Sequence, residues 1–314
     1  MSWFAEAPAN IALIKYMGKQ NNQTNTPTNA SLSYTLPHLK SYVALKQHDG
    51  PMDIWKPLHK PGLFTQSFSA DAQQRYLNHL AFLKKQLHYT GSFCVQSGNN
   101  FPHGAGLASS ASSFAALTQC TVKACAELTQ TPCLSIDKQA ALSRQGSGSS
   151  CRSFFEPWAL WETNTVTSIH LPYPDLQHHV VLIHAGEKKV SSSQAHQRIT
   201  TAPHYETRPE RAANNLTALL RALEHQQWEE AYLICWREFQ DMHALFKQAN
   251  PPFTYISSQT QDALSRIQQQ WKHAGDGPLV TMDAGPNIHL LYRSDQTALA
   301  LHMKQTLMSD YNVL

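Results

Sequence analysis

Alternating apolar and polar positions predict strands in the first hundred residues. Alternation and β-branched content place these strands at 11–16, 31–36, 41–48 and 92–99. The polar, turn-rich segment at 18–29 is expected to be a loop between the first two strands. Before the last of them, apolar residues return at helical spacing, at Tyr76, Leu80, Leu83 and Leu87. This spacing predicts an amphipathic helix over 71–89.

The helical period dominates in the rest of the chain. We expect helices from about residue 109 to Glu127, at 135–146, over 211–246 with a break near Gln226, and at 257–275. Apolar runs predict strands at 178–186, 278–283 and 288–293. Strands and helices mix without regular βαβ alternation, which predicts an α+β fold. A polar segment after the apolar run at 178–186 predicts a boundary near Ala185, with domains at 1–185 and 186–314.

One short stretch, FPHGAGLASSASSF at 101–114, has the features of an anion-binding site rather than of a core segment. Gly104 and Gly106 precede four serines and then a helix, and the chain has only 13 glycines in all. The first N–H groups of a helix lack intrahelical partners and carry partial positive charge, so this arrangement suits an anion such as phosphate. The alternative is an ordinary serine N-cap. The motif is neither a P-loop nor a dinucleotide fingerprint.

Composition narrows the functional classes. The 314 residues are 42% hydrophobic and 15% charged, as in globular proteins, and the net charge is +3. No Lys/Arg run exceeds two residues, so we expect no nucleic-acid partner, whereas a small anionic substrate stays open. No apolar stretch suits a membrane span or a signal peptide. The six cysteines form no C-x-x-C pair, which suits free thiols in the cytoplasm. The histidines form no H-E-x-x-H motif, and we expect no protein-ligated structural metal.

Three further glycine-containing blocks carry charged candidates. In PANIALIKYMGK at 8–19, Lys15 and Lys19 are either site residues or two solvated lysines at a strand end. In SRQGSGSSCRSFF at 143–155, Arg152 can fork a carboxylate or phosphate, or form a surface ion pair. In TMDAGPN at 281–287, Asp283 ends an apolar strand, where it can enter a cleft or cap a turn. Four anion-suited blocks in one chain favour the functional interpretation.

Taken together, these blocks resemble the mevalonate diphosphate decarboxylases of the GHMP kinase superfamily. The resemblance runs from Ala7 to about Tyr292. It rests on APANIALIKYMGK, PTNASLSYTL, GAGLASSASSFAAL, SRQGSGSSCRS, EKKVSSS and TMDAGPN. It implies a two-domain GHMP kinase-like fold with mixed or antiparallel sheets packed with helices and an active site between the domains. It also implies a cytoplasmic homodimer.

The resemblance implies a reaction as well. Family members use ATP and Mg²⁺ to phosphorylate the tertiary 3-hydroxyl of mevalonate 5-diphosphate. The phosphate and the carboxylate then leave, the latter as CO₂, giving isopentenyl diphosphate. Phosphorylation turns a poor leaving group into a good one. Such a site must hold a diphosphate, a triphosphate and a carboxylate close together.

Residue by residue, the matches assign candidate roles. Asp283 matches the catalytic aspartate, and Arg152 matches the residue expected to hold the carboxylate. Asn10 matches an asparagine that orients Arg152 or the substrate, and Lys15 is a further catalytic candidate. The expected substrate-binding residues are Tyr16, Lys19, Ser147, Ser149, Arg152 and Ser192. The expected ATP-binding residues are Gly104, Ala105, Gly106, Leu107, Ala108, Ser109, Ser110 and Ser112.

The chain departs from the family pattern at several positions. Met17 stands where Trp is common, Gln20 to Asn22 replace an aspartate-rich turn, and Ala195-His196 replace a usual Gly-Met pair. These changes leave every catalytic candidate in place. They leave room for an altered substrate preference, especially at the phosphate end of the substrate. The competing interpretations are a mevalonate 5-phosphate decarboxylase, a mevalonate kinase, and a catalytically silent ligand-binding paralogue.

Overall fold

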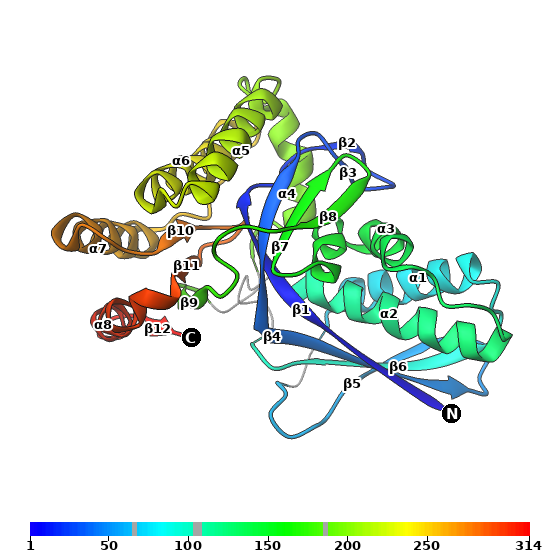
Figure 1. Ribbon diagram of the computed structural model, residues 1–314. Coiled ribbons are helices and arrows are strands. Elements are labelled where there is room, and N and C mark those ends of the chain that lie inside the picture. The colour runs from blue at the N-terminus through cyan, green and yellow to red at the C-terminus, as the bar shows by residue number, and fades with distance from the viewer. Residues whose placement is uncertain (65–67, 103–108, 185–187) are drawn as a thin grey trace.

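Two long antiparallel strands, β1 (Ser2–Ile14) and β4 (Ser31–His48), cross the centre of the molecule (Figure 1). They belong to a computed structural model that describes residues 1–64, 68–102, 109–184 and 188–314. One edge of β4 pairs with β1, and its other edge pairs with two different strands, β7 near residues 31–34 and β6 over 41–48. The two strands predicted at 31–36 and 41–48 are therefore one continuous strand.

The larger sheet has the order β5-β6-β4-β7-β8, with β1 added to β4. Its other strands are β5 (Ile54–Pro57), β6 (Ser92–Asn99), β7 (Trp158–Glu162) and β8 (Thr165–Ile169). The β5–β6 pair is parallel and the others are antiparallel. A short hairpin, β2 (Lys19–Asn21) with β3 (Thr26–Pro27), lies within the segment predicted as a loop.

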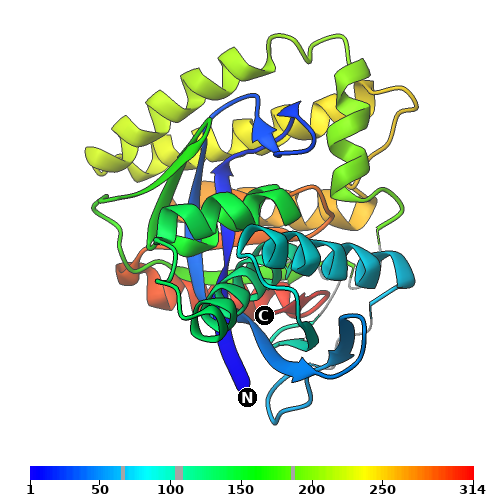
Figure 2. The ribbon, with the colours of Figure 1, turned by 90° about the vertical axis from the view of Figure 1, so that its right-hand side faces the viewer.

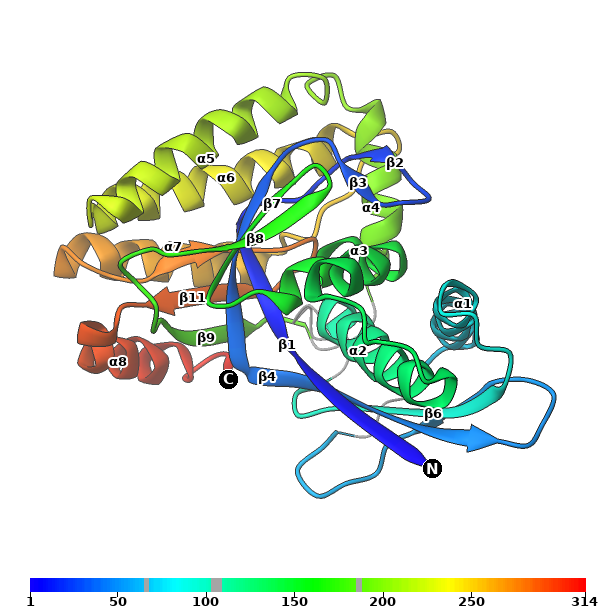
Figure 3. The same ribbon diagram turned by 45° about the vertical axis from the view of Figure 1, so that its right-hand side comes forward.

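Helices α1 (Ala70–Gln86), α2 (Ser109–Thr129) and α3 (Ile136–Gly146) lie together beside this sheet (Figure 3). Helix α2 packs on β1 and β4. The core between them contains Val43, Leu45, Leu80, Phe93 and Phe114. A 3₁₀ helix, η1 (Gly148–Phe154), follows α3 and also contacts α2.

The second sheet is antiparallel, in the order β10-β11-β9-β12. Its strands are β9 (Gln177–Leu182), β10 (Leu279–Thr281), β11 (Ile288–Tyr292) and β12 (Asn312–Val313). The helices of this half are α4 (Ser192–Arg198), α5 (Arg208–Glu224), α6 (Trp228–Gln248), α7 (Ser258–Ala274) and α8 (Thr297–Leu307). Two 3₁₀ turns are η2 (Ile199–Thr201) and η3 (Ser294–Gln296). Figure 2 shows α5 and α6 running side by side.

The α+β class and the mixed sheets are confirmed. The predicted break at Gln226 is also confirmed, because α5 ends at Glu224 and α6 begins at Trp228. The sequence patterns missed α4, α8, β5, β7, β8 and β12, and also the first part of β1, because the strand was predicted only over 11–16. The domain division at Ala185 stays a prediction, although β9 pairs within the second sheet. None of the helices in the described ranges combines the length and apolar content that crossing a membrane requires.

The two halves share buried surface. Ile11, Leu13 and Ile14, near the end of β1, are fully buried in the same core as strands β9 to β11 and helices α5 to α7. The first half of β1 instead packs in the core beneath α2, through Trp3 and Ala7. Strand β1 therefore fixes one half of the chain relative to the other, and it ends where both halves meet.

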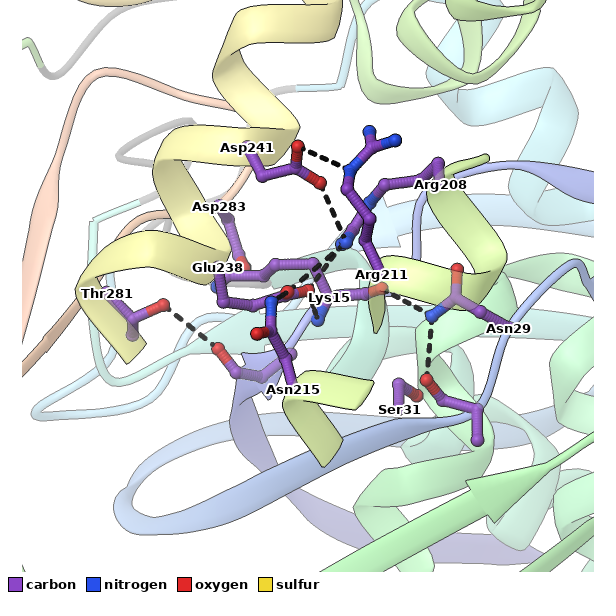
Figure 4. Close-up of polar contacts among 12 residues, drawn as sticks. Lys15, Asn29, Ser31, Arg208, Arg211, Asn215, Glu238, Asp241, Thr281 and Asp283 are labelled. Atoms are coloured by element: carbon purple, nitrogen blue, oxygen red, sulfur yellow. Dashed lines mark hydrogen bonds and ion pairs between the residues drawn. The ribbon is translucent and has the colours of Figure 1, made fainter. Parts of the chain in front are cut away.

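A buried ion pair joins α5 to α6 (Figure 4). Arg208 and Glu238 are both 0% exposed, and two guanidinium nitrogens of Arg208 donate to the two carboxylate oxygens of Glu238. Asn215 Nδ2 donates to Glu238 Oε2 over 2.7 Å. Asp241 forms ion pairs with Arg208, over 3.1 Å, and with the more exposed Arg211, whose Nε also donates to Asp241 Oδ1. Buried charges require such partners, because desolvation is otherwise uncompensated.

We expect Arg208→Ala to lower the free energy of unfolding by about 3–5 kcal/mol, because it leaves the Glu238 carboxylate buried without its main partner. The matched control is Arg211→Ala on the same helix. Arg211 also pairs with Asp241 but is about a third exposed, so we expect a loss of at most about 1 kcal/mol. Urea denaturation measures both values. Equal losses would show that burial of the pair does not matter.

Candidate active site

A pocket of about 480 Å³ opens where β1 ends between the two halves. Most predicted site residues of the described ranges line it: Lys15, Tyr16, Lys19, Ser109, Ser110, Ser147, Ser149, Arg152, Ser192 and Asp283. They come from the end of β1, the β2 hairpin, the start of α2, η1, the start of α4 and the turn after β10. Gly104, Ala105, Gly106, Leu107 and Ala108 lie outside the described residues. The structure therefore brings distant sequence blocks to one place.

At the base of the pocket, Lys15 Nζ lies 2.8 Å from Asp283 Oδ1. The Lys15 side chain is 1% exposed, whereas that of Asp283 is 32% exposed. Burial lowers the pKa of Lys15, although Asp283 opposes this effect. Burial raises the pKa of Asp283, but Lys15, together with His289 and Arg152, outweighs this effect and the net pKa is lowered. Asp283 is thus an ionised carboxylate that presents one side to the pocket.

The backbone of Lys15 is also held firmly (Figure 4). Its N–H donates to Glu238 Oε1 over 3.0 Å, and its carbonyl accepts from Asn29 Nδ2 over 3.0 Å. The Arg208–Glu238 pair therefore contacts the site directly through its carboxylate. The interpretation of Lys15 as a solvated lysine at a strand end is wrong, because the side chain is buried and paired.

Two contacts fix the turn that carries Asp283. The carbonyl of Asp283 faces His243 Nε2 over 3.0 Å and accepts from Gly285 N–H over 2.7 Å. Before the turn, Thr281 Oγ1 donates to the Ala12 carbonyl of β1 over 3.1 Å (Figure 4). The turn is thus anchored to α6 and to the strand that delivers Lys15, so the ion pair has anchored backbone on both sides.

Arg152 is buried, at 4% exposed, so its interpretation as part of a surface ion pair is wrong. Its Nε donates to Asn10 Oδ1 over 3.1 Å, and its Nη1 donates to Ser31 Oγ over 2.8 Å. Asn10 Nδ2 in turn donates to the Ser149 carbonyl and to Ser153 Oγ. Asn10 does not line the pocket; it holds η1 and the guanidinium in place. Arg152 and Asp283, about 130 positions apart, share one cleft.

A second group of polar residues lines another part of the pocket. Tyr16 packs between Trp161 and His196 with tilted rings, whose centroids lie 4.6 and 4.5 Å from its own. Burial and the nearby Arg75 lower the pKa of Lys19. Arg75 of α1 is exposed and donates to the Gly146 carbonyl over 2.6 Å. Among the described lining residues, Asp283 is the sole carboxylate, so this second part is cationic.

Serine hydroxyls and a further lysine also line the pocket. Ser147 Oγ donates to Ser110 Oγ over 3.4 Å, which joins the start of η1 to the start of α2. Lys188 Nζ donates to the Ala284 carbonyl and lies 3.5 Å from Ser192 Oγ. Ser112, predicted to bind ATP, is 0% exposed and pairs with Ser41 Oγ over 2.7 Å; it does not line the pocket.

Sequence reasoning missed several lining residues, among them the charged or titratable side chains of Lys188, His196 and Arg75. Lys188 lies in the EKKVSSS block, and its position shortly before the serine run was the available signal. His196 was visible as a departure from the family pattern. Arg75 lies on the predicted helix 71–89 and carries no local signal, because only packing of α1 beside α3 brings it to the pocket.

This arrangement has clear chemical consequences. Buried or partly buried cations, serine hydroxyls and one ionised carboxylate suit a substrate with several anionic groups and one proton to remove. Within the described ranges, no group of three or more His, Cys, Asp or Glu side chains forms a metal site. Cys94, Cys120, Cys125, Cys133, Cys151 and Cys235 are all free.

Two family models match the chain. The diphosphomevalonate decarboxylase-like N-terminal domain matches residues 7–169. The mevalonate 5-diphosphate decarboxylase C-terminal domain matches residues 179–312. Together they cover both sheets and nearly every block that lines the pocket.

Comparison with individual proteins leads to the same family as the two family models. The chain is 31% identical to a diphosphomevalonate decarboxylase of Aspergillus fumigatus, over 91% of this chain and 75% of the relative. A mevalonate diphosphate decarboxylase structure from Legionella pneumophila superimposes with a TM-score of 0.95 at 56% identity, covering all of both chains. A structure described as MDDEF in complex with MVAPP, AMPPCP and magnesium has a TM-score of 0.86 at 29% identity, covering 100% of this chain and 96% of its own. The chain belongs to the diphosphomevalonate decarboxylase family of the GHMP superfamily.

Proposed function

We propose that the protein catalyses the ATP-dependent decarboxylation of mevalonate 5-diphosphate to isopentenyl diphosphate, ADP, phosphate and CO₂. The observation that carries the proposal is the ionised Asp283 carboxylate, paired with buried Lys15 in the same cleft as Arg152. The family membership and the relative with bound MVAPP and AMPPCP support it. The small-molecule substrate therefore binds in the pocket between the halves.

Asp283 is the group suited to the 3-hydroxyl. Its carboxylate orients the alcohol and accepts its proton as phosphoryl transfer begins. Lys15 keeps this base ionised, because its charge offsets the desolvation that raises the pKa of a buried carboxyl. The oxygen then carries a phosphate, which is a good leaving group. As that phosphate departs, electrons of the C–CO₂⁻ bond move toward C3 and CO₂ is released.

Arg152 is the group suited to the substrate carboxylate. Its Nε and Nη1 bonds to Asn10 and Ser31 fix the plane of the guanidinium before substrate arrives. Nη1 has a second hydrogen, and with Nη2 it forms a fork that matches a carboxylate. Such prior positioning favours catalysis because little orientational freedom is lost at the transition state.

The part of the pocket that has cations but no carboxylate among the described residues suits phosphate groups. We assign Tyr16, Lys19, Ser147, Ser149 and Ser192 to the diphosphate. Ser109 and Ser110, at the start of α2, are assigned with Lys188 to ATP, together with the predicted loop 104–108. Ser112 is assigned no contact with ATP, because its hydroxyl is buried against Ser41, and it supports α2 instead.

Magnesium fits this set of residues as a companion of ATP. Mg²⁺ usually keeps several waters and is held by one or two carboxylates together with substrate phosphates. The hydroxyls of Ser109 and Ser110 in the pocket lining would supply oxygen donors beside those of the triphosphate, and the described residues form no protein-only cage. The ion would neutralise charge on the triphosphate. Homodimerisation and a cytoplasmic location stay predictions.

Turnover of three substrates tests the proposal. Purified protein with ATP and Mg²⁺ is incubated separately with mevalonate, its 5-phosphate and its 5-diphosphate. We expect CO₂ and an isopentenyl product from the 5-diphosphate, detected by CO₂ capture and mass spectrometry. ADP formation from mevalonate without CO₂ would identify a kinase instead. CO₂ from the 5-phosphate alone would identify a monophosphate decarboxylase, and no turnover of any substrate would identify a catalytically silent ligand-binding paralogue.

We expect Asp283→Asn to lower kcat at least ~10²-fold with a modest change in KM, because the amide keeps the shape but neither the charge nor the base. Steady-state kinetics with mevalonate 5-diphosphate provides the measurement. The matched control, Asp310→Asn, removes an aspartate that is half exposed on the surface and should leave kcat unchanged. Retention of wild-type kcat by Asp283→Asn would remove the base from the mechanism.

We expect Lys15→Met to move the acidic limb of the kcat/KM profile to higher pH. In the wild type the pKa of Asp283 is lowered below its ordinary value of 3.8, so this group should cause no loss of activity down to about pH 5. Without Lys15, burial raises the pKa of Asp283, and residual activity is lost at higher pH as the carboxyl protonates. The control, Lys84→Met, breaks the Lys84–Asp53 pair away from the pocket. Superimposable normalised profiles for Lys15→Met and wild type would contradict the assignment.

A further inference from the structure

The pocket contains a histidine whose protonation state is fixed by its neighbours. His196 lies in α4, one helical turn after Ser192, and is 8% exposed. Its ring packs on Tyr16, which packs in turn on Trp161. The residue lines the pocket together with Lys19 and Ser192. It stands where the family pattern usually has Met.

A backbone donor determines which ring nitrogen carries the hydrogen. Gly18 N–H donates to His196 Nδ1 over 3.0 Å. Nδ1 must therefore be an unprotonated acceptor, and the ring hydrogen lies on Nε2. Gly18 has φ +112°, and a Cβ there would lie 2.5 Å from Thr28 Oγ1 and 2.8 Å from Tyr205 Oη. This packing holds the donor in place, so the tautomer is fixed.

The ring is also held neutral. Burial, and then the nearby Lys19 ammonium, lower the pKa of His196 to about 3. Protonation would also place an Nδ1–H against the Gly18 N–H. At neutral pH His196 is consequently a directional N–H donor without a charge.

The charges around His196 indicate which substrate group its Nε2–H can contact. Asp283 pairs with Lys15 over 2.8 Å, and Lys188 Nζ donates to the carbonyl of the next residue, Ala284. His196 instead packs on Tyr16 and lines the pocket with Lys19, whose charge lowers the pKa of His196. The first group contains the acid that suits a hydroxyl. The second contains cations and donors, which suits a polyanion.

We propose that His196 donates its Nε2 hydrogen to the terminal phosphate of the substrate diphosphate and thereby favours the 5-diphosphate over the 5-phosphate. This inference rests on the proposed function. Lys19 and Arg75 attract any phosphate through charge, which depends weakly on orientation. A fixed neutral donor adds directional recognition, because it is satisfied only when an oxygen occupies one position. His196 is thus a specificity-determining residue.

Two substitutions separate this role from the contact with Gly18. His196→Asn places Oδ1 near the position of Nδ1, so it can accept from Gly18 N–H, but it has no donor at the Nε2 position. His196→Gln reverses this: its amide NH₂ reaches the Nε2 position, and the acceptor for Gly18 is lost. Circular dichroism and thermal unfolding establish that each variant is folded.

We expect His196→Asn to raise KM for mevalonate 5-diphosphate about 10-fold or more, the loss typical of a hydrogen bond to a charged group. The KM for ATP and the kcat/KM for the 5-phosphate should change less than about twofold, which is within the ordinary scatter of a distant substitution. His196→Gln should retain most of the preference for the 5-diphosphate. Lys19→Ala, by comparison, should weaken both substrates. An unchanged KM in the Asn variant, or equal losses for both substrates, would overturn the inference.

Binding of inorganic diphosphate and inorganic phosphate, measured by calorimetry, keeps this test separate from the proposed function. Wild type should bind diphosphate more tightly than phosphate, and His196→Asn should remove most of that difference. This result with no turnover of mevalonate 5-diphosphate would support the donor role and reject the proposed function. Equal discrimination by wild type and the Asn variant would reject the donor role whatever the turnover.

Discussion

The ammonium group of Lys15 is buried at the junction of the two halves, and the rest of the site depends on how that charge is compensated. A buried ammonium without a partner is strongly unfavourable, so Lys15 requires an anion at contact distance. Asp283, from the turn after β10, supplies it over 2.8 Å. Glu238 of α6 binds the Lys15 backbone and carries a second buried negative charge nearby. Both carboxylates come from the second half, so the electrostatics of one lysine require the halves to meet.

That requirement also explains the buried network behind the pocket. Glu238 needs Arg208 and Asn215 to satisfy its own oxygens, and Arg208 brings in Asp241 (Figure 4). The network extends from α5 to the backbone of Lys15. A polar network of this kind adds stability only when its members are satisfied. This network also holds the backbone at the end of β1, next to Lys15, in position.

The described residues of the pocket form two different electrostatic environments, one with a carboxylate among its cations and one with cations and neutral donors alone. Around Asp283, cations and a carboxylate coexist, and the neighbouring cations keep the acid ionised. Around Lys19, cations and neutral donors occur without an acid among the described lining residues, which suits phosphate oxygens. In the proposed function, this arrangement allows proton removal and anion binding in one cleft, because the base and the phosphate-binding cations do not neutralise each other. The fixed tautomer of His196 adds geometric selectivity where charge alone distinguishes phosphates poorly.

The sequence by itself determined the α+β class, most helices, and the glycine blocks that carry Lys15, Arg152 and Asp283. These features depend on local periodicity and turn chemistry, which adjacent residues encode. Only the tertiary structure decided which strands pair and which side chains are buried. Local pattern divided β4 near Pro37, whereas long-range pairing with β1 makes it one strand. Local pattern also left Lys15 either solvated or functional, and gave no sign of Arg75 in the site. Burial, pKa and neighbourhood depend on residues far away in the sequence, such as Asp283 for Lys15, so no local window contains them.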